Sequence, residues 1–325
     1  MLECLLFAPL CAGLLMLLLG NTTVCRGLLL LTAVLHTALS VKLAADVSGG
    51  LHPQALAGLL APDALGTLFL VLASVLFLVA SVYGVGYLRD GGDRWGVCDL
   101  AAKLAPEYGI RYRSPGFPIY KTGHYGGFIG RGFDGLAEYR ALVREAKTRG
   151  AHFIKLMISG LMDFSQYGVL TGEPLPPDLI RDMIACAHDE GFSVMAHANG
   201  DEAVRAALAG SVDSIEHGAY LTDETLCQLA ESRAVWVPTL VTIGNLIGCG
   251  RFPDEVLKPL LAYQRNAVKK AAALGAKIAC GSDAGAYRVL HGQGGMDERA
   301  LLRRILGEGA DAVLDTGNTA IMARF

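Results

Sequence analysis

The sequence FIKLMISG, residues 153–160, is a short apolar run that ends in glycine and contains one charge, Lys155. Apolar residues occupy both odd and even positions, which is typical of a parallel strand buried on both faces. A lone ammonium is costly there unless it is paired or neutralised. The alternative is a lysine at a strand end whose flexible stem carries the charge to solvent. The stretch predicts a buried strand with a lysine of unusual chemistry.

Three further segments end in the same way, each with a potential metal ligand on or just after an apolar run. They are VMAHANG with His197, SIEHG with His217 and IACGSDAG with Asp283. Helical patterns fill the gaps, as in PPDLIRDMIACAHDEG, where Pro177 suits the first turn and Gly191 the C-cap. Strands that alternate with helices predict a parallel (β/α) barrel with its chemistry at the C-terminal strand ends.

The expected barrel is incomplete. Six strands are expected after residue 97, near 111–120, 152–158, 193–197, 214–217, 235–240 and 277–281. A closed TIM barrel needs eight, so the pattern predicts an α/β fold that lacks its first strands. Helices are expected at 201–209, 223–232 and 254–274, and an irregular insertion at 242–253 would lie over the active face.

Charge divides the chain into two unlike parts. The first 88 residues contain only five charged side chains, which are Glu3, Arg26, Lys42, Asp46 and Asp63. Three apolar runs lie there, at about 5–20, 27–43 and 65–87, and the third exceeds the roughly 20 residues that span a bilayer. A buried hairpin of core helices is the alternative for the first two. We expect an all-α transmembrane segment of about three helices over 1–90, a joint at 91–96 and a soluble domain at 97–325.

Charge placement also bears on location and partners. Arg26, Arg89 and Arg94 fall on one side if all three runs span, which favours an external N-terminus and a cytoplasmic barrel. The start carries Glu3 and no basic residue, unlike a signal peptide, so we expect the helices to be retained as an anchor.

A net charge of −3 gives no indication of nucleic-acid binding. Eight cysteines without a C-x-x-C pair are typical of free thiols in a reducing compartment.

The four candidate ligands suit zinc or another divalent metal. His197 and His217 on successive strands supply the neutral imidazole nitrogens that zinc prefers. A desolvated Lys155 amine can react with carbon dioxide to give a carbamate, an anionic ligand able to bridge two cations. Asp283 can bind metal and take a proton from the nucleophilic water. Any one of these residues is more often structural, but together and in this order they predict a metal centre.

Residues 97–325 resemble the amidohydrolase superfamily, in particular imidazolonepropionase-like hydrolases and metallo-dipeptidases. The likeness runs through KTGHYGGFIG, FIKLMISG, VMAHANGDEAV, DSIEHGAYL, VWVPTLV and CGSDAGAYRVLHGQG. It implies a distorted TIM barrel and hydrolysis of a small amide or dipeptide-like substrate. By position, a carboxylated Lys155 would bridge two metals, and His197 and His217 would hold one of them. Asp283 would contact the other and act as the acid/base group, while His124 would face the substrate.

The chain departs from that family at its start. A binuclear site also needs a His-x-His pair on the first strand, and no such pair occurs in the 325 residues. One weakly bound metal on His197, His217 and Lys155 is therefore expected, with poor activity. Residues 97–325 would then form a truncated hydrolase domain in a chimeric chain, which is a natural fusion, a pseudogene product or a joining error between two genes.

The membrane-like part has a resemblance of its own. APDALGTLFLVLASVLFLVASVYGVGYLRD, residues 61–90, resembles the N-terminal region of proton-translocating membrane subunits of hydrogenase complexes and respiratory complex I. Lys42 and Asp63 lie near helix ends and are interpreted as interfacial, and His36 as a polar residue that faces a neighbouring helix. The alternative function is a non-catalytic component of a membrane complex, with the barrel remnant as a passenger.

Overall fold

The computed structural model describes residues 2–19, 22–58, 60–83, 87–108 and 110–325. The chain folds as two compact units. The first, the helical unit, comprises Met1–Leu88 and Leu104–Arg111. The second, the sheet unit, comprises Arg89–Lys103 and Tyr112–Phe325. All eight cysteines are free thiols.

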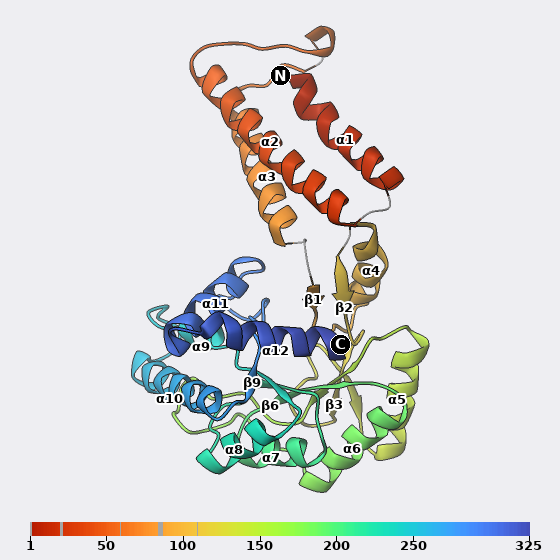
Figure 1. Cartoon of the computed structure of the whole chain (residues 1–325), viewed down its shortest axis with the longest axis vertical. Coiled ribbons are helices and arrows are strands. Elements are labelled where there is room, and N and C mark those ends of the chain that lie inside the picture. The colour runs from red at the N-terminus through yellow and green to blue at the C-terminus, as the bar shows by residue number, and fades with distance from the viewer. Residues whose placement is uncertain (1, 20–21, 59, 84–86, 109) are drawn as a thin grey trace. The chain divides into compact units, whose positions relative to one another are not determined.

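The helical unit contains three long helices, one in each predicted apolar run. They are α1 (Leu2–Leu19), α2 (Thr22–Ser48) and α3 (Ala64–Tyr83) (Figure 1). The short 3-10 turn η1 (Leu56–Gly58) lies between α2 and α3, and a second one, η2 (Ala105–Tyr108), follows α4 later in the chain. The His36 ring on α2 contacts the Ser74 hydroxyl on α3 at 2.9 Å. The prediction that His36 faces a neighbouring helix is therefore confirmed. Asp63 accepts the backbone N–H of Gly66 and so caps α3.

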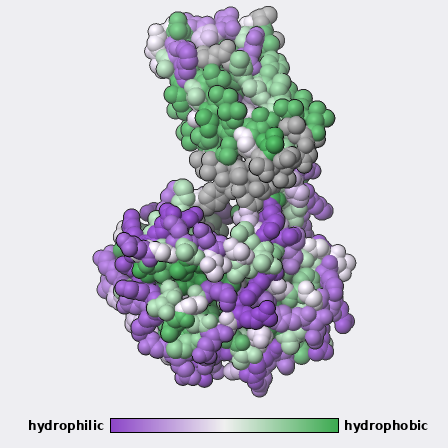
Figure 2. Space-filling view, viewed as in Figure 1, coloured by the Kyte–Doolittle hydropathy of each residue, from purple (hydrophilic) through white to green (hydrophobic). Residues whose placement is uncertain are grey.

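The membrane expectation is met only in part. Of the residues that the structure describes, only the helix segment Gly27–Ser48 is long and apolar enough to cross a membrane. The other two helices contain shorter apolar stretches, Leu2–Met16 and Ala64–Val75, so three spanning helices are not confirmed. Figure 2 shows hydrophobic residues gathered on the surface of this unit. A core helix or a signal sequence passes the same length test, so the finding is weak by itself.

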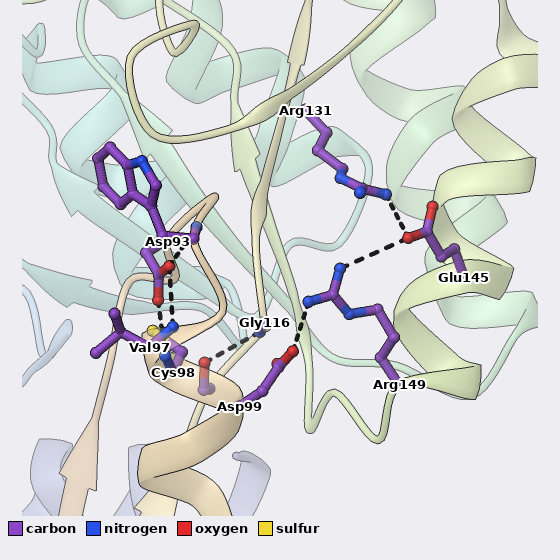
Figure 3. A network of polar contacts seen from close by, with 10 residues as sticks. Asp93, Val97, Cys98, Asp99, Gly116, Arg131, Glu145 and Arg149 are labelled. Atoms are coloured by element: carbon purple, nitrogen blue, oxygen red, sulfur yellow. Dashed lines mark hydrogen bonds and ion pairs between the residues drawn. The ribbon is translucent and has the colours of Figure 1, made fainter.

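The sheet unit opens with a short segment tied to its neighbours by charge. The chain runs from β1 (Tyr87–Arg89), which pairs with β2 (Arg111–Arg113), into α4 (Val97–Leu104). The Asp93 carboxylate accepts backbone N–H groups at the start of α4, including that of Cys98 at 2.7 Å (Figure 3). Asp99 on α4 pairs with Arg149 at the end of α5 (Leu136–Thr148). These contacts fix the segment after the joint against α5.

Seven parallel strands form the main sheet. Its order is β4-β3-β5-β6-β7-β8-β9. The bounds are β3 (Pro118–Lys121), β4 (Arg131–Phe133), β5 (Ile154–Met157), β6 (Val194–Ala198), β7 (Ser214–His217), β8 (Val235–Val237) and β9 (Lys277–Ile278). A parallel sheet with intervening helices is thus confirmed. Within the described residues no pairing joins β4 to β9, so the sheet is open.

Two strand predictions were wrong. The expected strand at 111–120 is interrupted after Arg113 and becomes β2 and β3, which belong to different sheets. Pro115 lies in the gap, where a residue without an N–H cannot donate to a ladder. Strand β4 was missed because it has only three residues, one of which is Gly132. The other five expected strands are present.

Helices cover the sheet in the order of the sequence. They are α6 (Pro177–Asp189), α7 (Asp201–Ala209), α8 (Asp223–Glu231), α9 (Val241–Gly244), α10 (Asp254–Ala273), α11 (Gln293–Leu306) and α12 (Ala310–Arg324) (Figure 1). The three helices expected at 201–209, 223–232 and 254–274 are confirmed within one residue at each end. The insertion at 242–253 was expected to be irregular, but it begins within α9 and packs Ile243 and Leu246 against Leu257.

Successive strand residues face opposite sides of the sheet. On β5, Ile154 and Leu156 belong to the main hydrophobic core under the helices. Lys155 and Met157 therefore point to the other face, where the chemistry of the site lies. Helix α12 packs against β9 so closely that a Cβ on Gly317 would lie 1.9 Å from the Ile278 carbonyl oxygen, which only glycine allows.

Candidate metal centre

Lys155 is the buried cation of this face. Its side chain is only 6% exposed, and desolvation lowers its pKa to about 8. The carboxylates of Glu216 and Asp283 oppose this shift, and the charge of Arg89 adds to it. The prediction of a strand buried on both faces is confirmed, because all four residues of β5 are buried. A larger fraction of neutral amine is present at neutral pH than for a lysine in water.

His197 lies on β6, two residues after Met195, and is almost fully buried. Desolvation lowers its pKa well below the usual range, and the nearby His217 and Lys155 add to the effect. Its Nε2 lies 3.2 Å from the Gly160 carbonyl oxygen. A proton on Nε2 would donate to this carbonyl and leave the lone pair on Nδ1, whereas the Asn199 amide, 3.4 Å from Nε2, would donate to an unprotonated Nε2. In either tautomer the neutral His197 ring has one unprotonated nitrogen.

His217 ends β7 in a left-handed conformation, with φ of 70°. Its carbonyl oxygen accepts the Trp236 indole N–H at 3.0 Å and the Gln264 amide at 2.8 Å, which pins the backbone in this conformation. The next residue, Gly218, has no room for a side chain, since a Cβ would lie 2.5 Å from the Trp236 nitrogen. The His217 Nδ1 contacts the Thr239 hydroxyl at 2.6 Å. Burial lowers the pKa of His217 to about 3, so the ring is neutral.

Asp283 follows β9 and also adopts a left-handed conformation, with φ of 54°. Desolvation by the surrounding protein raises the pKa of its carboxyl, and the Lys155 ammonium opposes this rise. Its side chain is nevertheless reached by solvent. Because water reaches the carboxylate, the rise is smaller than full burial would produce. Non-glycine residues with positive φ are uncommon and gather at functional sites, and two of the four predicted ligands have this feature.

Lys155, His197 and His217 lie on the three adjacent strands β5, β6 and β7, and Asp283 follows β9, two strands beyond β7. The rings of His197 and His217 are 4.7 Å apart between centroids, and Lys155 lies within electrostatic reach of both histidines and of Asp283. Among the described residues, however, no three His, Cys, Asp or Glu side chains lie close enough to hold one ion. Asp283 therefore does not complete a three-ligand set with the two histidines.

The donor set is suited to one metal rather than two. Two neutral imidazoles, each with one nitrogen available, match the ligands of zinc. A third ligand must come from Lys155, whose ammonium cannot bind a cation but whose carbamate can. Nothing among the described side chains supplies the two further neutral ligands of a second ion.

Arg89 and Glu216 form a buried ion pair near Lys155. Arg89 donates to both oxygens of Glu216, at 2.9 and 3.1 Å, and to the Ser214 hydroxyl at 2.8 Å. Its guanidinium also lies over the Phe325 ring, 4.7 Å from the centroid. Glu216 precedes His217 on β7, so the pair anchors the strand that carries this ligand. The sequence analysis placed Arg89 at the domain boundary and did not connect it with the site.

The predicted substrate residue His124 is exposed in the loop after β3. Its neighbour Tyr125 was not singled out from the sequence, yet its ring lies 4.9 Å from that of His197. Burial and the nearby Asp283 carboxylate raise the pKa of Tyr125, so it stays a neutral hydroxyl. In the sequence, the one indication of a role for Tyr125 is its aromatic side chain within KTGHYGG.

Three other histidines of the sheet unit have structural or exposed positions. His152 contacts the main chain of Ser114, His188 pairs with Asp213, and His291 is exposed. Two surface cavities of about 390 and 490 Å³ lie between α4 and α5 and between α8 and α10. Neither is lined by a predicted ligand, so the candidate centre rests on side-chain geometry and not on cavity size.

Two curated proteins share sequence with about half of this chain. An uncharacterised protein of Mycobacterium tuberculosis is 34% identical over 172 residues, which are 51% of this chain and 45% of that protein. Ochratoxinase of Aspergillus niger is 28% identical over 161 residues, which are 46% of this chain and 32% of that enzyme. The chain thus spans less than half the length of these curated relatives.

Solved structures show the same fold. The chain resembles a Xaa-Pro dipeptidase (TM-score 0.61, 24% identity, 73% of this chain and 64% of that one) and an amidohydrolase (TM-score 0.60, 25% identity, 79% and 68%). A. niger ochratoxinase gives a TM-score of 0.60 at 20% identity, over 73% of this chain and 60% of that one. The profile of the amidohydrolase family matches residues 94–320. The chain therefore belongs to the amidohydrolase family.

Proposed function

We propose that this chain is a metal-dependent hydrolase of amide or related C–N bonds that works slowly with a single divalent ion, preferably zinc. The observation that carries the proposal is the pair of neutral imidazoles, His197 and His217, beside the buried Lys155. The Lys155 ammonium interacts with the carboxylates of Glu216 and Asp283, and as a carbamate the same side chain would supply a third ligand beside the two imidazole rings.

One ring nitrogen of His197, His217 Nε2 and a carbamate on Lys155 would hold the metal. The ion would polarise the scissile carbonyl and activate water for attack. Asp283 is the acid/base group: its accessible carboxylate accepts a proton from the attacking water and returns it to the leaving nitrogen. Tyr125 covers His197 and presents a neutral hydroxyl to the bound substrate, and His124 on the same loop is the outer substrate contact.

The substrate class we propose is a small amide such as a dipeptide or an N-acyl amino acid. Support comes from the names of the similar proteins, which include a Xaa-Pro dipeptidase and an ochratoxinase. The first is a hydrolase of dipeptides by its name. Loops set specificity in folds of this kind, so the proposal stays at the level of the bond class.

Hydrolysis assays with a matched lysine pair test this proposal. The full chain, purified in detergent with zinc and bicarbonate, should cleave a panel of dipeptides and N-acyl amino acids slowly. Lys155→Met should abolish the zinc-dependent cleavage, because the third ligand is lost. Lys277→Met, which removes a partly exposed lysine on β9, should leave the rate unchanged. Equal rates for the two variants would refute the role of Lys155.

The second part of the proposal is that the helical unit anchors the chain in a membrane with the sheet unit in the cytoplasm. Large apolar side chains are exposed on all three helices, among them Leu18 (84%), Leu31 (55%) and Phe69 (63%). Exposed apolar surface of this extent is unfavourable in water. Residues 1–90 would thus act as the anchor of a chimeric chain, with 91–96 as the joint and 97–325 as the hydrolase domain.

Fractionation and thiol labelling test the anchor. The full chain should stay in the membrane pellet after alkaline extraction. The exposed thiol of Cys227 on α8 should react with an impermeant maleimide only after the cells are permeabilised, with the modified peptide identified by mass spectrometry. Release by alkali would argue against the anchor, and labelling of Cys227 in intact cells would reverse the proposed orientation.

A further inference from the structure

Thr239 follows β8 in a conformation that its residue type rarely adopts. Its φ is 49°, which is a strong outlier for a β-branched residue, and its side chain is 2% exposed. Among the residues that the structure describes, the one side chain that its hydroxyl contacts is His217, whose Nδ1 lies 2.6 Å away. The strained conformation therefore serves to deliver a hydroxyl to this ring nitrogen.

Glu298 holds the turn that contains Thr239. This carboxylate on α11 is completely buried and accepts the backbone N–H groups of Leu240 at 3.0 Å and Val241 at 2.9 Å. Burial of an acid at this position is costly, and two hydrogen bonds to consecutive N–H groups offset part of the cost. The next two residues after Thr239 are thus fixed by a side chain from a distant part of the sequence.

We propose that Thr239 is a positioning residue that fixes the orientation and tautomer of His217, and that Glu298 holds Thr239 in the conformation this requires. In this arrangement the His217 Nδ1–H donates to the Thr239 hydroxyl oxygen, and Nε2 keeps its lone pair. The positive charge of Lys155 near the ring favours a lone pair, not an N–H, on the nitrogen that faces the site. The inference about metal affinity rests on the proposed function, whereas the tautomer does not.

The tautomer is measured directly by nitrogen NMR. The full chain is labelled with 15N-histidine, and the His217 ring signals are identified by their loss in His217→Asn. We expect the proton on Nδ1 in the metal-free protein and loss of this preference in Thr239→Val. A proton on Nε2 in the parent chain overturns the proposal, whether or not any variant folds.

Metal affinity gives the second measurement. Thr239→Val should weaken zinc binding about 10- to 100-fold in a chelator competition, the usual range for a hydrogen-bond partner of a ligand. Thr239→Ser keeps the hydroxyl and should restore the affinity. Thr225→Val is the matched control, since Thr225 is a completely buried threonine on α8 away from the site. Glu298→Gln retains one acceptor oxygen for the two N–H groups and should fall between Thr239→Val and the parent chain.

The outcomes separate the two proposals. Zinc affinity of folded Thr239→Val equal to that of the parent chain overturns the positioning role. Weakening by Thr225→Val to the same extent overturns it as well, because general destabilisation would then explain the loss. If the parent chain binds no zinc but carries the proton on Nδ1, the proposed function fails while the positioning of His217 by Thr239 stands.

Discussion

Replacing Arg89 with methionine should destabilise the sheet unit by about 3 kcal/mol. Arg89 and Glu216 have side chains that are only 8% and 5% exposed, and the Arg89 guanidinium binds both carboxylate oxygens. Removing one partner of such a buried pair leaves an uncompensated charge and typically costs about 3 to 5 kcal/mol. The nearby Lys155 ammonium compensates part of the Glu216 charge, which places the expected cost at the lower end of that range.

Urea unfolding in detergent, followed by tryptophan fluorescence, measures this cost. Trp236 is completely buried on β8, next to the strand that carries Glu216, so it reports on the sheet unit. The double variant Arg89→Met/Glu216→Leu should recover part of the loss, because no buried charge remains unpaired. Lys147→Met, which breaks an exposed pair, should cost less than about 1 kcal/mol.

Two results would refute this reasoning. A loss below about 1 kcal/mol for Arg89→Met would show that the pair behaves like a surface salt bridge. A double variant less stable than Arg89→Met alone would show that the packing of the two side chains, not their charge, stabilises this face of the sheet.

Two further predictions concern pH and backbone geometry. The hydrogen bond to Asp213 raises the pKa of His188, so this pair stabilises the fold fully below about pH 6.5 and less as pH rises through the folded-state pKa. His188→Gln should therefore be less stable than the parent chain at low pH, and this difference in the free energy of unfolding should shrink as pH rises. A difference that does not change with pH would contradict this. Gly218→Ala should cost about 2 to 5 kcal/mol in urea unfolding through strain and clash, against about 1 to 2 kcal/mol for Gly150→Ala, where positive φ meets open space. Equal costs for Gly218→Ala and Gly150→Ala would show that the steric clash at Gly218 does not contribute.

Local pattern was sufficient to predict most helices and strands. Apolar periodicity and caps located α7 and α10 within one residue, because the amphipathic faces and the glycines after them are visible in sequence. The same logic failed at β4, where three residues with a central glycine carry no periodic signal. It also joined β2 to β3 across Pro115, although the two strands belong to different sheets.

The site was predictable only as far as ligands mark strand ends. His197 and His217 stand out as polar residues at the end of apolar runs, and Lys155 as the one charge inside such a run. The residues that support them are linked to them only in three dimensions. Arg89 lies 127 positions from Glu216, and Glu298 lies 58 positions from Leu240. No spacing rule connects such pairs, so their roles emerge only from the folded chain.

Native mass spectrometry of the detergent-solubilised chain, loaded with zinc and bicarbonate, decides how the centre is built. If His197, His217 and a carbamate on Lys155 hold the metal, the parent chain should carry at most one zinc ion together with the mass of one bound carbon dioxide. Lys155→Met should lose both. Two tightly bound zinc ions in the parent chain, or one zinc ion retained in Lys155→Met, would contradict this arrangement of ligands.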